Sequence, residues 1–238
     1  MIEMRAVSVD LSSRPILRDV NLQVSSGELV GLVGRSGSGK STLLNLIAGL
    51  YTPTSGEIKI DGEPARPGLI RGVVFQEESL LGWLSAIDNV LFTARSEAAS
   101  GEWGTLLKQL GLEDARDDLP KQLSTGMRKR VELARALAAD AMYLLADEPF
   151  GTLDAVTRRD LWALWKNLQI TTPRTGILCT HDPEEAVRLC TVIYPLKGSR
   201  PATTGKPIRI PDRVTALAVD SADPEITLLR NRLLSEIA

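Results

Sequence analysis

The sequence predicts an α/β fold, in which helices flank a parallel sheet and the chain adds a small antiparallel sheet and an inserted helical segment. Three observations predict it. Short apolar runs, typical of buried parallel strands, stand at residues 29–33, 142–146 and 176–180. Apolar and polar residues alternate near the N-terminus, which indicates antiparallel strands. Residues from about 78 to 125 have apolar residues at helical spacing instead.

The antiparallel strands are expected at residues 6–11, 21–24 and 57–60, where apolar residues recur with a period of two. The segment Ser12-Ser13-Arg14-Pro15 has the composition of a turn between the first two. Asp61-Gly62 is a hairpin signal after the third. These strands would form a small sheet beside the main one.

A glycine-rich run follows the apolar segment at residues 29–33 and precedes a helix-like one at 43–48. It reads Gly34-Arg35-Ser36-Gly37-Ser38-Gly39-Lys40-Ser41-Thr42. This is the P-loop pattern, in which glycines let backbone N–H groups and a helix N-terminus surround phosphate oxygens. Lys40 is expected to reach the outer phosphates, Ser41 to place a hydroxyl on Mg²⁺, and Thr42 and the loop amides to hold the inner phosphates. A plain Gly/Ser turn is the alternative, but the lysine and the flanking elements favour a nucleoside triphosphate site.

Further helices are expected in the second half of the chain. Residues 126–139 place Val131, Leu133, Ala134 and Leu137 on one face, and we expect the basic residues Arg128, Lys129 and Arg130 on a solvated face. A final amphipathic helix should begin at Asp223-Pro224, where a capping residue precedes proline.

Polar residues end three of the predicted strands. Asp147 and Glu148 follow residues 144–146. A carboxylate near the metal and a second one facing the γ-phosphate across a water suit triphosphate hydrolysis, so we expect Asp147 to support Mg²⁺ and Glu148 to act as general base. His181, the only histidine, follows residues 176–180, and Gln76 ends the apolar run 73–75 with an amide that can bind Mg²⁺ or water. Each of these two residues is unremarkable alone.

The composition is that of a soluble globular protein of 238 residues with a formal net charge of −2. One domain, 1–238, accommodates this length. The charge provides no field that would gather nucleic acid, so no nucleic-acid partner is expected. No apolar stretch approaches the roughly 18 residues of a membrane span, and the N-terminus lacks a signal-peptide core, so we expect the chain in the cytoplasm. Cys179 and Cys190 are expected to be buried thiols without chemistry.

Taken together, six runs in this order resemble the ATP-binding cassette (ABC) ATPases over essentially the whole chain. They are the P-loop at 34–42, the Q-loop Val74-Phe75-Gln76-Glu77-Glu78, the signature Leu123-Ser124-Thr125-Gly126-Met127, the Walker B run Leu144-Leu145-Ala146-Asp147-Glu148-Pro149, the D-loop Gly151-Thr152-Leu153-Asp154 and the switch histidine in Thr180-His181-Asp182.

The resemblance implies a P-loop NTPase core of the RecA-like type and an ATPase that is completed only by a second subunit, most simply in a homodimer. ATP would lie between the P-loop of one subunit and Ser124 and Gly126 of the other, so that ATP binding closes the pair and hydrolysis releases it. By the same resemblance, Gln76 senses the γ-phosphate and helps to bind Mg²⁺, His181 holds the γ-phosphate, and Asp154 contacts the partner.

Within the family, residues 75–84 and 88–90 are similar to the ATPase subunits of nitrate, taurine and aliphatic sulfonate importers. A short C-terminal extension at about 207–238, ending in an apolar helix, agrees with that class, and the helical insertion spans about 78–125. Glu78–Leu84 would then be the docking site for a transmembrane permease subunit, with Leu81 and Trp83 as apolar contacts, although both could equally be core residues. The chain would act on the cytoplasmic face of the inner membrane, and indirectly with an extracytoplasmic solute-binding protein.

Two departures from the family pattern stand out. Leu11 occupies the place where an aromatic residue usually stacks on adenine, and Thr125 replaces the first glycine of the signature. We expect Thr125, with its added Cβ, to lower ATPase activity. Two other interpretations remain: a soluble ABC ATPase acting on DNA or ribosomes, and a weakly active partner in a heterodimer. The identity of the solute lies in other chains.

Overall fold

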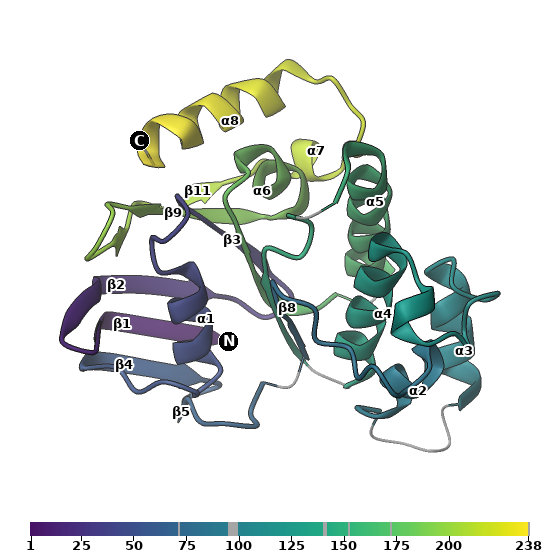
Figure 1. The fold of residues 1–238 in the computed structure, drawn as a ribbon. Helices are drawn as coiled ribbons and strands as arrows, with labels where there is room; N and C mark the ends of the chain where they lie inside the picture. Colours follow the sequence, from purple (N-terminus) through teal and green to yellow (C-terminus); the bar gives the residue numbers. More distant parts are fainter. Residues whose placement is uncertain (71, 95–99, 140–141, 152, 172, 238) are drawn as a thin grey trace.

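The computed structural model describes residues 1–238 except 71, 95–99, 140, 141, 152, 172 and 238. Its strands form two sheets (Figure 1). The first is antiparallel, with the order β2-β1-β4-β5, and consists of β1 (Ile2–Leu11), β2 (Arg14–Val24), β4 (Ser55–Ile60) and β5 (Glu63–Pro64). The second has the order β10-β9-β3-β8-β7-β6, with β11 also paired to β9, and consists of β3 (Leu29–Val33), β6 (Gly72–Val74), β7 (Tyr143–Asp147), β8 (Thr175–Thr180), β9 (Val192–Lys197), β10 (Thr203–Thr204) and β11 (Ile208–Arg209).

The antiparallel sheet confirms the alternating pattern, but the first turn is shorter than predicted, because Arg14 and Pro15 already pair with β1 and β2 begins at Arg14 instead of residue 21. Ser12 and Ser13 take φ values of 48° and 62° between β1 and β2, and Asp61 and Gly62 take 52° and 85° between β4 and β5. β1 begins at Ile2, four residues earlier than predicted. The pattern of alternate burial continues through that extension, because Ile2 is fully buried and pairs with Val24 of β2.

The central strands β6, β7, β8, β3 and β9 of the second sheet run parallel. The apolar runs predicted β3, β7 and β8, whereas β9 was not predicted. Helices and the first sheet cover its two faces, so alternate residues of one strand enter different cores: Leu178 of β8 packs into one, and Ile177 and Cys179 into the other. Cys179 and Cys190 are buried free thiols, as expected. Because the strands are parallel, the loops after β3, β7 and β8 leave the same edge of the sheet, and this edge holds the predicted site residues.

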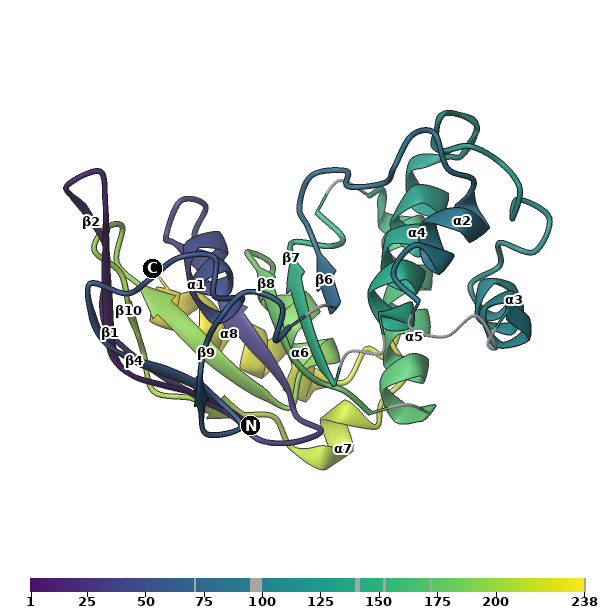
Figure 2. The ribbon, with the colours of Figure 1, turned by 90° about the horizontal axis from the view of Figure 1, so that it is seen from below.

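The helices lie on both sides of the second sheet and at the end of the molecule opposite the antiparallel sheet (Figures 1 and 2). They are α1 (Lys40–Ile47), α2 (Ala86–Leu91), α3 (Ser100–Gln109), the short 3₁₀ helix η2 (Pro120–Gln122), α4 (Thr125–Ala138), α5 (Ala155–Thr171), α6 (Pro183–Leu189), α7 (Asp212–Thr215) and α8 (Pro224–Ile237). In the inserted segment, α2 and α3 pack against α4. Residues 95–99 of this segment lie outside the described residues.

The C-terminal helix α8 begins at Pro224, as predicted, and the Oδ1 atom of Asp223 accepts a hydrogen bond of 2.8 Å from the backbone N–H of Glu225. Its buried face, formed by Ile226, Leu229 and Leu233, contacts α6 and β9. Among the described residues, no helix combines the length and the apolar character that crossing a bilayer requires.

Candidate active site

The P-loop connects β3 to α1 and is held in a tight turn by its glycines. Gly39 has a φ of 100°, a left-handed conformation that side chains disfavour, and a Cβ there would also lie 3.0 Å from Leu17 Cδ2. A Cβ on Gly34 would lie 2.8 Å from Ser38 Oγ. The loop therefore takes this path only with glycine at these positions. Arg35, Ser36 and Gly37 are solvent-exposed at its tip.

Lys40 is the first residue of α1, and its side chain folds back under the loop. Only 4% of it is exposed, and its Nζ atom donates to the carbonyl oxygens of Gly34, at 2.9 Å, and Arg35, at 3.2 Å. The same Nζ lies 3.2 Å from Glu148 Oε1. The ammonium group is thus held at the P-loop by two carbonyl dipoles and one carboxylate.

Asp147 ends β7 beside Ser41 of α1. A hydrogen bond from the Ser41 hydroxyl and the charge of Lys40 favour its ionised form, but burial outweighs both and raises the pKa of Asp147 above its usual value, with the charge of Glu148 adding to the rise. Its Oδ1 atom is buried and has no hydrogen-bond partner. Thr42, one residue further along α1, is half-buried. Asp147 and Ser41 therefore place a free carboxylate oxygen and a hydroxyl side by side.

Glu148 is placed by its backbone as well as by its side chain. Its φ of 44° is unusual for a non-glycine residue, and its N–H donates to the Cys179 carbonyl at 2.9 Å. The Oε2 atom lies 3.0 Å from His181 Nδ1, so the carboxylate is shared between Lys40 and His181. The structure brings these three residues together from α1, the end of β7 and the end of β8.

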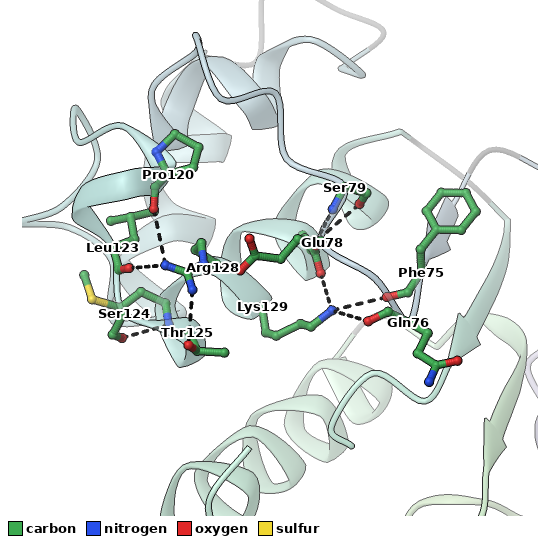
Figure 3. A network of polar contacts seen from close by, with 12 residues as sticks. Phe75, Gln76, Glu78, Ser79, Pro120, Leu123, Ser124, Thr125, Arg128 and Lys129 are labelled. Atoms are coloured by element: carbon green, nitrogen blue, oxygen red, sulfur yellow. Dashed lines mark hydrogen bonds and ion pairs between the residues drawn. The ribbon is translucent and has the colours of Figure 1, made fainter. Parts of the chain in front are cut away.

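Gln76 follows β6, the strand next to β7, and its side chain is solvent-exposed. Its carbonyl oxygen accepts a hydrogen bond of 3.2 Å from Lys129 Nζ, while its side-chain amide extends away from Lys129 (Figure 3). The parallel register pairs Val74 with Ala146, so Gln76 leaves its strand at the edge where Asp147 leaves the neighbouring one.

The predicted signature lies at the start of α4, on a different part of the molecule. Ser124 caps the helix, its Oγ accepting from Met127 N at 3.2 Å, and a Cβ on Gly126 would lie 2.6 Å from Thr157 Cγ2 of α5. Thr125 is the first helical residue, and its Oγ1 accepts from Arg128 Nη2 at 3.2 Å. In the described part of the chain, no hydrogen bond or ion pair joins Ser124 or Gly126 to the P-loop.

Asp154 lies just before α5 and holds the first turn of that helix. Its Oδ1 atom accepts 3.0 Å hydrogen bonds from the N–H groups of Val156 and Thr157, and these bonds lower the pKa of Asp154, with the one from Thr157 as the largest cause. The carboxylate is exposed. Thr152 of the same predicted motif lies outside the described residues.

The segment predicted to dock a permease is held from within by Asn89 of α2, which is fully buried. Its Oδ1 accepts from Leu81 N at 2.8 Å, and its Nδ2 donates to the carbonyls of Leu81, Leu84 and Ser85. Trp83 projects from this loop with 76% of its surface exposed, whereas Leu81 is half-buried. The helical segment expected from about residue 78 therefore begins later than predicted, because Ser85 caps α2 and the helix begins at Ala86.

The structure also corrects the expected solvated face of α4. Lys129 is only 5% exposed and Glu132 only 1%. Together they contact residues 75–79, which are far away in sequence (Figure 3). Sequence reasoning missed these residues, although the Lys-x-x-Glu spacing on one helix face could have indicated an ion pair. It also missed Arg200, whose Nε donates to the carbonyl of Gly37 in the P-loop at 2.9 Å.

Comparison with known proteins identifies the family of this chain. The ABC transporter family model matches residues 17–151. The chain is 43% identical to the taurine import ATP-binding protein TauB of Chromobacterium violaceum, over 94% of this chain and 90% of that one. It is 40% identical to the nitrate import ATP-binding protein NrtD of Synechococcus elongatus, over 92% and 83%.

A solved structure of the ATP-binding cassette MJ0796, a dimer in a post-hydrolysis state bound to ADP and Pi, is 32% identical to this chain. It superimposes with a TM-score of 0.76 over 89% of this chain and 99% of that one. The two chains share one fold, and together with the family match over more than half of the sequence this shows that the chain belongs to the ATP-binding cassette family of ABC transporter proteins.

Proposed function

We propose that this chain is the ATP-hydrolysing subunit of an importer for a small anionic or zwitterionic solute of the nitrate, taurine or sulfonate kind. The observation that carries the proposal is the cluster of Lys40, Glu148 and His181 at the P-loop, in a chain 40 to 43% identical to taurine and nitrate import subunits over more than nine tenths of its length. The cluster supports hydrolysis, and the relatives support import.

ATP binding would change the partners of Lys40. Its ammonium group now binds two P-loop carbonyls and Glu148, and an entering triphosphate offers it more negative charge. Transfer of Lys40 to the phosphates would release Glu148 from its ion pair. The freed carboxylate, still beside His181, would then accept a proton from the attacking water.

Mg²⁺ would be held by Ser41 and Asp147, with Gln76 as a further oxygen donor. The fit rests on Asp147, whose buried Oδ1 has no partner in the structure while burial raises its pKa, since a cation would satisfy both conditions. The described residues contain no group of three or more His, Cys, Asp and Glu side chains that could hold a metal by themselves. Bound Mg²⁺ would neutralise charge on the outer phosphates.

A second subunit would complete the site. Ser124, at the N-terminus of α4, is exposed and makes no polar contact with the P-loop of its own chain in the described residues. The N-terminus of a helix favours anions, so this turn suits the γ-phosphate bound to a partner subunit. We infer a homodimer, with Asp154 near the contact.

Docking to a permease would use residues 78–84. Trp83 offers an exposed apolar side chain on a loop that Asn89 keeps in one conformation, which limits the entropy lost on binding. In this assembly the chain would lie on the cytoplasmic face of the inner membrane, opposite an extracytoplasmic solute-binding protein. Leu11 is half-buried at the end of β1, so adenine would be bound without a stacked aromatic from that position.

Affinity purification of the tagged chain from mildly solubilised native membranes, followed by mass spectrometry, tests the proposal. A multi-span permease and a solute-binding protein from the same complex are the expected companions, and ATP hydrolysis of the complex should rise with the transported solute. Ribosomal or DNA-repair proteins without a permease would contradict it.

A further inference from the structure

A buried ion pair on α4 is bound to the main chain of the segment that contains Gln76. Lys129 and Glu132 stand three residues apart on the helix, with 2.9 Å between Lys129 Nζ and Glu132 Oε2. Their side chains are 5% and 0% exposed. A buried ion pair is weak evidence of stabilisation, because the cost of removing two charges from water offsets their attraction. Its partners therefore say more about its role.

The further partners of Lys129 are the backbone carbonyls of two consecutive residues, Phe75 and Gln76. Its Nζ donates to both oxygens at 3.2 Å, in addition to its bond with Glu132 (Figure 3). All three ammonium donors are thus used. Two of them fix the backbone immediately before and at Gln76, while the side-chain amide of Gln76 stays free to reach the nucleotide edge of the sheet.

Glu132 and Arg135 hold the same segment three residues further on. Glu132 Oε1 accepts from the Ser79 backbone N–H at 2.7 Å and from the Ser79 hydroxyl at 3.2 Å. Arg135 Nη1 donates to the Ser79 carbonyl at 2.6 Å, and its Nη2 donates to the Ser79 hydroxyl. The polar groups of Ser79 are therefore bound by two residues of α4.

These contacts come from the helix whose first turn carries Ser124 and Gly126. An α-helix moves as a rigid element over this length, so a displacement of residues 75–79 must displace the signature turn unless the contacts break. We propose that the Lys129–Glu132 pair is a positioning device, a clamp that makes Gln76 and the signature turn move together. The inference rests on the proposed function and assigns residues to its internal coupling.

A purely structural role for the pair would predict a different pattern. A pair that only stabilised α4 could be formed within the helix, with its remaining donors and acceptors satisfied by α4 or by water. Here the remaining bonds go to the main chain of residues 75–79. Each of these bonds joins residues 53 or 54 positions apart in sequence. Arg128 adds a parallel link, since its Nε donates to Glu78 and its Nη1 to the Leu123 carbonyl at 2.6 Å.

The test replaces the clamp by apolar residues of similar volume, Lys129→Met with Glu132→Leu, in the full-length chain. Such a replacement is often neutral or stabilising, so folding can be kept while the tether is lost. Lys108→Met with Glu113→Leu is the control, because that lysine–glutamate pair is exposed, lies outside α4, and among the described residues is joined to residues 75–79 by no hydrogen bond or ion pair. Lys129→Arg alone keeps the positive charge and should preserve the clamp. If the double variant Lys129→Met with Glu132→Leu unfolds, Lys129→Met with Glu132→Gln is a milder alternative.

Two readouts separate coupling from stability. We expect the clamp variant to keep the Tm of the parent and to keep its KM for ATP within about twofold. Its kcat should fall by about tenfold to a hundredfold, as for a misplaced catalytic group. In a Glu148→Gln background, ATP should change hydrogen exchange at residues 76–81 and 123–128 together in the parent and in the control, and only at one of the two segments in the clamp variant.

Equal kcat in the clamp variant and the control, with joint exchange changes in both, would overturn the clamp. A fall in Tm that accounts for the whole loss of activity, without rescue by Lys129→Arg, would overturn it as well. A parent chain that neither binds nor hydrolyses ATP contradicts the proposed function instead. In that case hydrogen exchange at the Ser79 amide, measured without nucleotide, still tests the clamp. If the clamp holds Ser79, its amide should exchange faster in the clamp variant than in the control.

Discussion

The Nδ1 atom of His181 lies 3.0 Å from Oε2 of Glu148, although the two residues stand 33 positions apart. They meet because β7 and β8 are parallel neighbours, with Asp147 paired to Cys179, so the residues that follow these strands emerge together. A carboxylate only accepts hydrogen bonds, so Nδ1 carries the proton in this contact. His181 thereby fixes the direction of the Glu148 carboxylate, and Nε2 remains for another partner.

Glu148→Gln should bind ATP but hydrolyse it about a hundredfold to ten-thousandfold more slowly, because the amide keeps the shape of the side chain and cannot take a proton. ATP should then trap a closed dimer, which size-exclusion chromatography with light scattering would detect. Glu113→Gln, an exposed residue on the helical segment, is the control. Unaltered turnover would remove Glu148 as the general base.

Lys40→Ala should lose nucleotide binding itself. The phosphate charge would go uncompensated, and Glu148 would also lose its counter-ion 3.2 Å away. Titration calorimetry with ATP measures the effect, and Lys59→Ala, which removes a half-buried lysine paired with Glu57 far from the P-loop in sequence, is the control. An ATP affinity equal to that of the parent would contradict the assignment of residues 34–42.

Much of the fold could be predicted because its signals are local. The turn at Ser12-Ser13, the P-loop and the cap at Asp223 each depend on residues next to one another in sequence. The start of α2 could not be predicted from the sequence, since residues 81–85 are held out of the helix by the buried side chain of Asn89. The clamp at Lys129 could not either, because its acceptors at Phe75 and Gln76 are brought to it only by the packing of α4 on β6.

The candidate site divides in the same way. Lys40, Asp147, Glu148 and His181 could be placed together because parallel strands end at one edge of a sheet. Their roles stay predictions. The ion pair between Lys40 and Glu148 had no signal in the sequence, since each residue was predicted to face phosphate or water and not the other.

Thr125→Gly should raise ATP turnover in the assembled transporter if the Cβ of Thr125 hinders the approach of phosphate to the signature turn. Thr125 has no positive φ, so the backbone does not require glycine there, and the substitution also removes the hydroxyl that accepts from Arg128. Helix stability should fall by up to about 1 kcal/mol. Thr125→Ser, which keeps the hydroxyl, separates the two effects, and unchanged turnover in Thr125→Gly refutes the hindrance.

Trp83→Ala should weaken association with the permease while leaving the ATPase activity and Tm of the isolated chain unchanged. The side chain is 76% exposed, so little core packing is lost, whereas an apolar anchor at an interface can contribute about 2 kcal/mol or more. Co-purification from membranes measures retention of the permease. Phe92→Ala, 68% exposed just after α2, is the control, and equal retention of the permease by both variants would place docking elsewhere.

The free energy of unfolding should fall between about pH 4.5 and pH 8 because of Glu185 on α6, and Glu185→Gln should reduce this fall. Burial raises the pKa of Glu185 from 4.5 to about 8, and the charge of Asp182 adds to the rise, against opposing contributions from Thr180, Trp162 and Arg158. Within this interval the folded chain binds a proton at Glu185 that the unfolded chain has released, so stability decreases as the pH rises. A tenfold difference in proton affinity between the folded and the unfolded chain corresponds to about 1.4 kcal/mol.

Urea unfolding of parent and variant at about pH 5, 6, 7 and 8, which covers this interval, measures the difference. Glu184→Gln on the same helix is the control, and parallel pH profiles for parent and Glu185→Gln would contradict a protonated Glu185.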